Sequence, residues 1–114
     1  MHDMTTVILI NRAGMGETDP ALQQKLLATY LRLLNENNSL PAAICVYTEG
    51  VKLVVHGSPV LAELQALEAR GVHVISCLTC LDYYGLTEQL AVGVIGGMPD
   101  IIAAQWGAQK VITL

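Results

Sequence analysis

The chain has 114 residues, of which 53% are hydrophobic and 14% charged, and its formal net charge is -4. This length is typical of one domain, so we expect residues 1–114 to form a single domain. Six basic residues against ten acidic ones exclude the basic surface with which proteins bind nucleic acid. No apolar run approaches the ~18 residues of a membrane span and no secretion signal is present, which predicts a cytoplasmic protein without membrane contact. The high apolar content favours contacts between subunits, so we expect a homo-oligomer.

The N-terminal third of the chain predicts one buried strand followed by one helix. Residues 6–10 (Thr-Val-Ile-Leu-Ile) form a continuous apolar run, which is typical of a strand buried on both faces. A polar loop with two glycines follows over residues 11–17. Asp19 and Pro20 then predict a helix start, with Asp19 as N-cap and Pro20 at the first helical position. The apolar stripe of this helix consists of Leu22, Leu26, Leu27, Tyr30 and Leu34.

The same order of elements repeats in the middle of the chain. Residues 42–47 (Ala-Ala-Ile-Cys-Val-Tyr) predict a second buried strand, which runs into a polar, glycine-containing loop over 48–52. Residues 51–55 fit either a strand, by their propensity, or a helical turn, by the alternation of elements. Ser58 and Pro59 repeat the pattern of an N-cap followed by a first-position proline, so we expect a second helix to begin there.

The C-terminal part predicts two further repeats of this pattern. The β-branched residues of 72–75 indicate a third strand, and a short apolar stretch predicts a fourth strand around 90–92. A helix is expected over 98–106 and a last strand over 110–114. The alternation predicts an α/β fold of three layers, α/β/α, around a mainly parallel sheet of about five strands.

Polar side chains follow the first three predicted strands. Because ligands and chemistry collect at the C-terminal edge of a parallel sheet, we expect these three loops to meet at one edge. The loops bring Asn11 and Arg12, then Glu49 and Lys52, and finally Cys77, Cys80 and Asp82.

The Cys-x-x-Cys pair formed by Cys77 and Cys80 is the most informative feature of the chain. A free thiol has a pKa near ~8.5, so only a few per cent is thiolate at neutral pH. A cation such as Arg12 or Lys52 close to the sulfur would lower that pKa, and so would the N-terminus of a helix that begins near Leu78. We therefore expect the pair to be the reactive centre.

Other chemistry-bearing residues have plainer interpretations. Cys45 lies inside the second predicted strand, where a buried and inert thiol is expected. A zinc site needs four ligands, and His56 and His73 would have to complete the single cysteine pair. Gly14 and Gly16 match neither GxGxxG nor GxxxxGK, so they indicate a phosphate loop only weakly. We expect neither a metal nor an external cofactor.

Three segments resemble the DsrE/DsrF-like superfamily, and within it the DsrE-like domain of the YedF proteins, which are sulfurtransferase-like and linked to selenium metabolism. They are residues 11–17 (Asn-Arg-Ala-Gly-Met-Gly-Glu), 47–58 (Tyr-Thr-Glu-Gly-Val-Lys-Leu-Val-Val-His-Gly-Ser) and 76–86 (Ser-Cys-Leu-Thr-Cys-Leu-Asp-Tyr-Tyr-Gly-Leu). The resemblance covers nearly the whole chain, and the third segment is its most specific part.

This resemblance implies a compact α/β/α domain with flavodoxin-like layering and ring-like homo-oligomers, trimers or hexamers. It matches Cys77 to the cysteine that holds sulfur as a persulfide, and Cys80 to a resolving or second thiol. YedF-like proteins usually have an N-terminal TusA-like domain, which residues 1–114 do not include. The resemblance therefore implies a separate TusA-like or other sulfur-carrier protein as partner.

The matched loops also imply a set of substrate-binding residues. A persulfide carrier needs a nucleophilic thiolate together with cationic or backbone donors that hold the anionic sulfur. Arg12 has the alternative interpretation of a plain surface charge, while Asp82 and Tyr84 fit capping and packing of a short helix. The expected set is Asn11, Arg12, Gly14, Glu49, Gly50, Lys52, Asp82 and Tyr84.

The leading functional hypothesis is a carrier or transferase of sulfur, or of selenium, that accepts it as a persulfide on Cys77. A first alternative is a dithiol/disulfide oxidoreductase that uses the same pair without sulfur transfer. A second alternative is a non-catalytic assembly or regulatory subunit whose thiols are incidental.

Overall fold

The computed structural model describes residues 5–114 and has five strands, four α-helices and two 3-10 helices. The elements in chain order are β1 (Thr6–Ile10), α1 (Pro20–Glu36), β2 (Ala43–Val46), η1 (Thr48–Leu53), α2 (Leu61–Ala69), β3 (His73–Cys77), α3 (Leu78–Tyr83), η2 (Thr87–Gln89), β4 (Val94–Gly96), α4 (Met98–Gly107) and β5 (Lys110–Thr113).

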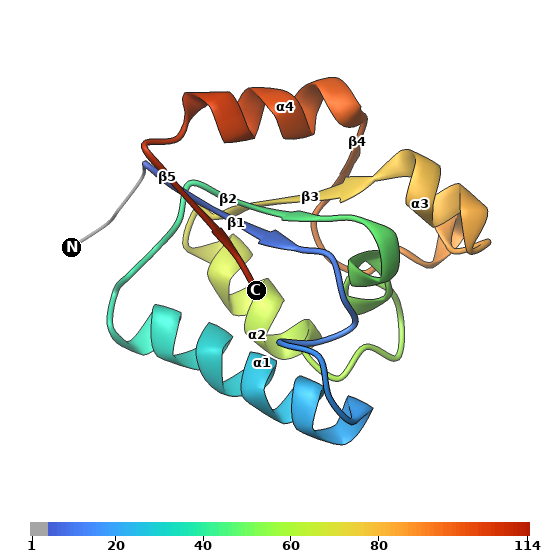
Figure 1. The fold of residues 1–114 in the computed structure, drawn as a ribbon, viewed down its shortest axis with the longest axis horizontal. Coiled ribbons are helices and arrows are strands. Elements are labelled where there is room, and N and C mark those ends of the chain that lie inside the picture. The colour runs from blue at the N-terminus through green and yellow to red at the C-terminus, as the bar shows by residue number, and fades with distance from the viewer. Residues whose placement is uncertain (1–4) are drawn as a thin grey trace.

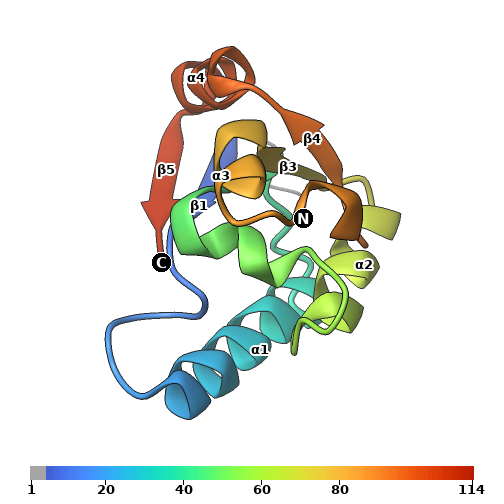
Figure 2. The same cartoon turned by 90° about the vertical axis from the view of Figure 1, so that its right-hand side faces the viewer.

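The strands form one sheet in the order β4-β3-β2-β1-β5, and every neighbouring pair is parallel. Figure 1 shows α1 and α2 on one face of this sheet and α4 on the other. Figure 2 shows that α4 bridges the two edge strands, from β4 to β5. The expected three-layer α/β fold is confirmed, and the sheet is entirely parallel.

The core lies around the two strands that run through the middle of the sheet. All residues of β1 and β2 are buried, because helices cover both faces of these strands. The pattern expected for α1 is only partly right: Leu27 is buried, but Leu22 and Leu26 are 45% and 44% exposed, and Leu31 is buried instead. The exposed Leu22 and Leu26 lie in the first two turns of α1, and the buried Leu27 and Leu31 lie nearer its middle. None of the helices within residues 5–114 is both long and apolar enough to cross a membrane.

The fourth strand lies later in the chain than its sequence indicates. The expected strand around 90–92 is wrong, because β4 spans Val94–Gly96 and pairs Val94 with Ile75 of β3. Leu90 instead forms an isolated antiparallel bridge with Val55. Gly93 turns the chain into the sheet with a φ of +79°, and a side chain there would collide with Val74. Long-range pairing thus decides where this strand begins.

Helix starts follow the sequence signals at two of three positions. Asp19 and Pro20 stand at the N-cap and first position of α1, and α4 begins at Met98, as expected. The start expected at Ser58 is wrong, because α2 begins at Leu61. The Ser58 hydroxyl instead accepts a hydrogen bond from the N–H of Val60 at 3.2 Å, so the residue forms a turn before the helix.

Candidate functional site

The three predicted loops meet at the C-terminal edge of the sheet. Ile10, Val46 and Ser76 are in register across β1, β2 and β3, so the residues that follow them leave the sheet side by side. The Thr48 hydroxyl donates to the carbonyl oxygen of Asn11 at 2.6 Å. The Thr48 backbone N–H donates to Sγ of Cys80 at 3.1 Å. The expected convergence of the loops is confirmed by these two contacts.

The two cysteines of the pair differ in their access to solvent. Cys77 is the last residue of β3 and is only 2% exposed. Helix α3 begins directly after it at Leu78, as expected, and is six residues long. Cys80 lies on the first turn of α3 and is partly exposed. A molecule approaching from solvent therefore meets the sulfur of Cys80 before that of Cys77.

The environment of Cys80 raises its pKa above the ordinary value. Burial is the largest cause, and the neighbouring Cys77 thiol acts in the same direction, while the hydrogen bond from Thr48 opposes both. The cations that would lower the pKa are paired with carboxylates: Arg12 lies 3.7 Å from Glu17, and Lys52 lies close to an acidic neighbour in η1. The hydrogen bond from Thr48 is thus the contact that opposes the raised pKa of Cys80.

Cys45 behaves as the sequence predicts for a strand residue. It is buried in β2, and burial raises the pKa of its thiol to about 11. A thiol with so high a pKa contains almost no thiolate at neutral pH and is a poor nucleophile.

Thr48 is the site residue that sequence reasoning missed. Its φ of +47° lies in the left-handed region, which is unfavourable for a β-branched residue. Gly50 approaches the carbonyl group of Ile10 so closely that a Cβ atom would collide with it, which holds η1 against the end of β1. The polar stretch after β2 indicated a loop here, but nothing in the sequence signals a positive φ at a threonine.

The segment η1 is also attached to α3 through side chains. Lys52 lies 3.2 Å from Glu49 and 4.7 Å from the centre of the Tyr84 ring. Tyr84 makes an edge-to-face contact with Tyr83, with 5.3 Å between the ring centres. Asp82 accepts a hydrogen bond from the Thr87 hydroxyl at 2.6 Å and so connects α3 to η2. These contacts fit the plainer interpretation of Asp82 and Tyr84, in which the two residues cap and pack a short helix.

The first loop contributes less to the thiol region than the sequence indicates. A side chain at Gly14 would collide with Gln23 of α1, so this glycine permits close packing of the loop on the helix. Gln23 also accepts from the Met15 N–H at 3.0 Å and donates to the Gly16 carbonyl at 2.7 Å. Within residues 5–114, no hydrogen bond or ion pair joins Arg12 or Gly14 to either thiol.

A zinc site has no support at the cysteine pair. His73 is the first residue of β3 and Cys77 the last, so about 13 Å of strand separates them. Among the residues that the structure describes, no three His, Cys, Asp or Glu side chains lie together as metal ligands do. Two buried polar atoms near this edge of the sheet have no hydrogen-bond partner among the described residues: Oδ1 of Asn11 and Oγ of Ser76.

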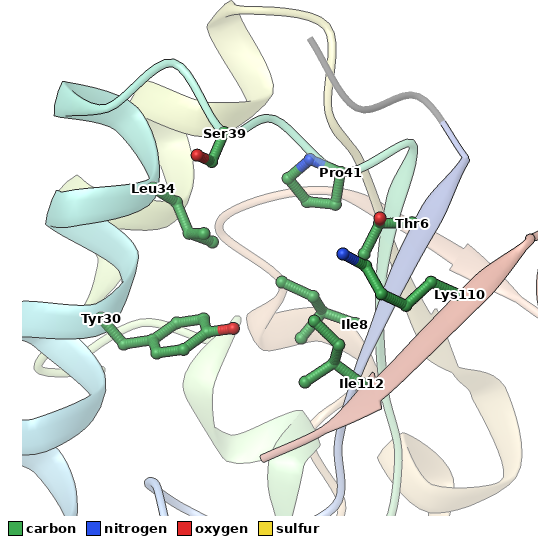
Figure 3. Close-up of a pocket in the computed structure, with 8 residues that line it drawn as sticks. All are labelled: Thr6, Ile8, Tyr30, Leu34, Ser39, Pro41, Lys110 and Ile112. Atoms are coloured by element: carbon green, nitrogen blue, oxygen red, sulfur yellow. The ribbon is translucent and has the colours of Figure 1, made fainter. Parts of the chain in front are cut away.

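Two cavities lie near the opposite edge of the sheet. One, of about 400 Å³, separates α4 from the first residues of β2 and β3, with His73 and Ala43 in its wall. The other, of about 170 Å³, lies between α1 and the beginning of β1 and β5 (Figure 3). Tyr30 points into it from α1, and Lys110, Ile8 and Ile112 line the other side (Figure 3). Neither cavity includes a residue of the cysteine pair.

This fold and site define the class of protein: an all-parallel, three-layer α/β domain with two thiols after its third strand. The sequence matches the DsrE/DsrF-like family over residues 6–114, so the chain belongs to that family, whose members are generally sulfur relay proteins. No curated protein matches the sequence.

Solved structures show the same fold at low sequence identity. The ychN protein from E. coli superposes with a TM-score of 0.72 at 24% identity, covering 97% of this chain and 99% of that one. MTH1491 from Methanobacterium thermoautotrophicum, a protein of unknown function, gives a TM-score of 0.70 at 21% identity and covers 98% and 100% of the two chains. BT1422 from Bacteroides thetaiotaomicron, a conserved protein of unknown function, gives 0.68 at 16% identity, with 96% and 95% covered. At these identities the likeness concerns the fold.

Proposed function

We propose that this chain is a sulfur carrier that holds sulfane sulfur as a persulfide on its Cys77/Cys80 pair and passes it to a partner. The resemblance assigns the persulfide to Cys77 and the role of resolving or second thiol to Cys80. The observation that supports this proposal is the pairing of two neighbouring thiols at the C-terminal edge of the sheet, one of them held by a backbone donor. The family membership supports sulfur rather than another cargo, and the resemblance to YedF extends the proposal to selenium.

The transfer needs no oxidant. A thiolate of the pair attacks the outer sulfur of a donor persulfide, R–S–SH, and a new sulfur–sulfur bond forms while the bond to the donor breaks. The donor leaves as a thiolate and takes up the proton that the attacking thiol released. One sulfur atom moves from donor to acceptor, and the total oxidation state is unchanged.

The partner that we propose is a protein, such as a TusA-like sulfur carrier. The two cavities described above lie at the opposite edge of the sheet and include neither thiol. The surface around Cys80 is exposed and includes two apolar side chains of the same short helix, Leu78 and the 84% exposed Tyr83. Such a surface suits transient contact with another protein, whose own thiol would reach Cys80.

We also propose that the protein forms homo-oligomers, with the trimer or hexamer of the resemblance as the expected size. Exposed apolar residues are numerous on α4 and the two edge strands: Val94, Ile95, Met98, Ile102, Trp106 and Val111. Met98, Ile102 and Trp106 follow each other at intervals of four residues, so they share one face of α4. Isolated exposed apolar residues are normal, but a group on one face is typical of an interface.

Intact-mass spectrometry after incubation with glutathione persulfide tests the proposal. A gain of one sulfur atom by the wild type, and no gain by the double variant Cys77→Ser/Cys80→Ser, is expected. Cys45 remains in both proteins and serves as the internal control. A loss of two hydrogens without a gain of sulfur supports the dithiol/disulfide oxidoreductase instead. An unchanged mass supports the non-catalytic subunit.

A further inference from the structure

We propose that Cys80, positioned by Thr48, is the thiol through which sulfur passes between this protein and its partners, and that Cys77 exchanges sulfur only with Cys80. This inference rests on the proposed function and reverses the order of the two thiols that the resemblance implies. It assigns Thr48 a positioning role that the sequence does not indicate.

Access is the first reason. Sulfur transfer requires the attacking sulfur to contact the outer sulfur of the donor persulfide directly. Cys77, the last residue of β3, is almost fully buried, whereas Cys80 on α3 is partly exposed. Leu78 and Thr79, which precede Cys80, are exposed as well, so the surface around its thiol is open to a docking protein.

The geometry at Thr48 is the second reason. The backbone N–H of Thr48 lies 3.1 Å from Sγ of Cys80, although 32 residues separate the two in sequence. Thr48 makes this contact while its own backbone has a left-handed φ of +47°, a conformation that costs a threonine about 1–2 kcal/mol. The Thr48 hydroxyl compensates by bonding the carbonyl oxygen of Asn11 at 2.6 Å. Strained residues held in this way are concentrated at functional sites.

The hydrogen bond from the Thr48 N–H affects both steps of the transfer: uptake of sulfur by Cys80 and its passage to Cys77. A hydrogen bond from an N–H stabilises a thiolate more than a thiol, so it opposes the rise in the pKa of Cys80 that burial and Cys77 cause, and makes Cys80 a better attacking group than it would be without this bond. The same bond favours Cys80 as the leaving group when Cys77 takes the sulfur. In that second step the Cys77 thiolate attacks the outer sulfur of the Cys80 persulfide, and Cys80 leaves as a thiolate that takes up the proton lost by Cys77. The step is reversible and involves no net oxidation.

Sulfur uptake by single variants tests the order of the thiols. With glutathione persulfide as donor, Cys77→Ser should take up one sulfur atom that peptide mapping places on Cys80, and Cys80→Ser should lose rapid uptake. Cys45→Ser, with the pair intact, should match the wild type. Rapid uptake by Cys80→Ser, with loss in Cys77→Ser, overturns the inference but leaves the proposed function standing. If the wild type takes up no sulfur, the proposed function is wrong, and the inference with it.

The role of Thr48 is tested by the pH profile of iodoacetamide alkylation at Cys80, which requires no sulfur donor. Thr48→Val removes the hydroxyl that holds the turn, so the profile should move to higher pH and the rate at neutral pH should fall by about threefold or more. Thr48→Ser keeps the hydroxyl and should restore the wild-type profile. If Thr48→Val does not fold, Thr48→Gly, which tolerates the positive φ but lacks the hydroxyl, should give a shift in the same direction. An unchanged pH profile in a folded Thr48→Val or Thr48→Gly protein overturns the role of Thr48. Faster alkylation of Cys77 than of Cys80 in the wild type overturns the inference that Cys80 is the more accessible thiol.

Discussion

The ammonium group of Lys52 lies 4.7 Å from the centre of the Tyr84 ring and connects η1 to α3. The same nitrogen lies 3.2 Å from Oε2 of Glu49, so one cation contacts both a carboxylate and an aromatic face. Thr48 at the start of η1 and Cys80 within α3 belong to the two segments that this contact holds together. The contact between Lys52 and Tyr84 thus supports the geometry of the thiol from outside the site.

A double-mutant cycle measures this support. Because both side chains are exposed to solvent, we expect a coupling energy of only about 0.5–1 kcal/mol between Lys52→Met and Tyr84→Leu. Urea denaturation of the wild type, the two single variants and the double variant gives the value. Strict additivity of the single effects would show that the cation–π contact contributes nothing.

Gly50 should tolerate no side chain. A Cβ atom there collides with the carbonyl group of Ile10, and backbone atoms cannot move aside as a flexible side chain can. We expect Gly50→Ala to lower the free energy of unfolding by about 2 kcal/mol or more, in the range of overpacked cores. Gly107→Ala is the matched control, because no atom lies within 4 Å of its Cβ position. Equal stability of the two variants would contradict the close approach.

The stability of the protein should fall in alkaline solution because of Cys45. Burial raises the pKa of this thiol from about 9 in the unfolded chain to about 11 in the folded protein. Below pH 9 the thiol is neutral in both states, and above it the unfolded chain loses its proton first, so the free energy of unfolding decreases as pH rises. The decrease attributable to Cys45 should reach about 2 kcal/mol near pH 11.

Cys45→Val provides the comparison for this pH dependence. Valine adds about one methyl group at a fully buried position, so the substitution should cost about 1–3 kcal/mol at neutral pH. The variant should show a smaller loss of stability between pH 9 and 11 than the wild type, as measured by urea denaturation at each pH. If both proteins lose the same amount, ionisation of Cys45 is not linked to unfolding.

The apolar surface of α4 should mediate self-association. Trp106 is 85% exposed near the end of α4, and burying an aromatic side chain of this size contributes strongly to an interface. We expect the wild type to elute as a trimer or a multiple of it, and Trp106→Glu to shift toward the monomer in size-exclusion chromatography with light scattering. Leu22→Glu, on the opposite face of the sheet, should leave the assembly unchanged. A wild type that is monomeric at micromolar concentration would refute the oligomer.

The sequence by itself determined the α/β class, the bounds of β1, the approximate positions of β2 and β3, and the presence of two thiols after the third strand. These features depend on local patterns: a continuous apolar run predicts a buried strand such as β1, and the position of Cys77 follows from the end of such a run. Strand β4 escaped prediction because three residues have too little pattern of their own, and pairing with β3 places them.

Only the tertiary structure decided the strand order, the burial of Cys77 against the partial exposure of Cys80, and the donor at Thr48. The contact between Thr48 and Cys80 depends on β2 and β3 being neighbours in one register, which brings together two loops that are 32 residues apart. The positive φ of Thr48 likewise depends on the carbonyl group of Asn11 and on the fit of Gly50 against β1. Such conformations reflect the balance of several long-range contacts, and no local preference of a threonine encodes them.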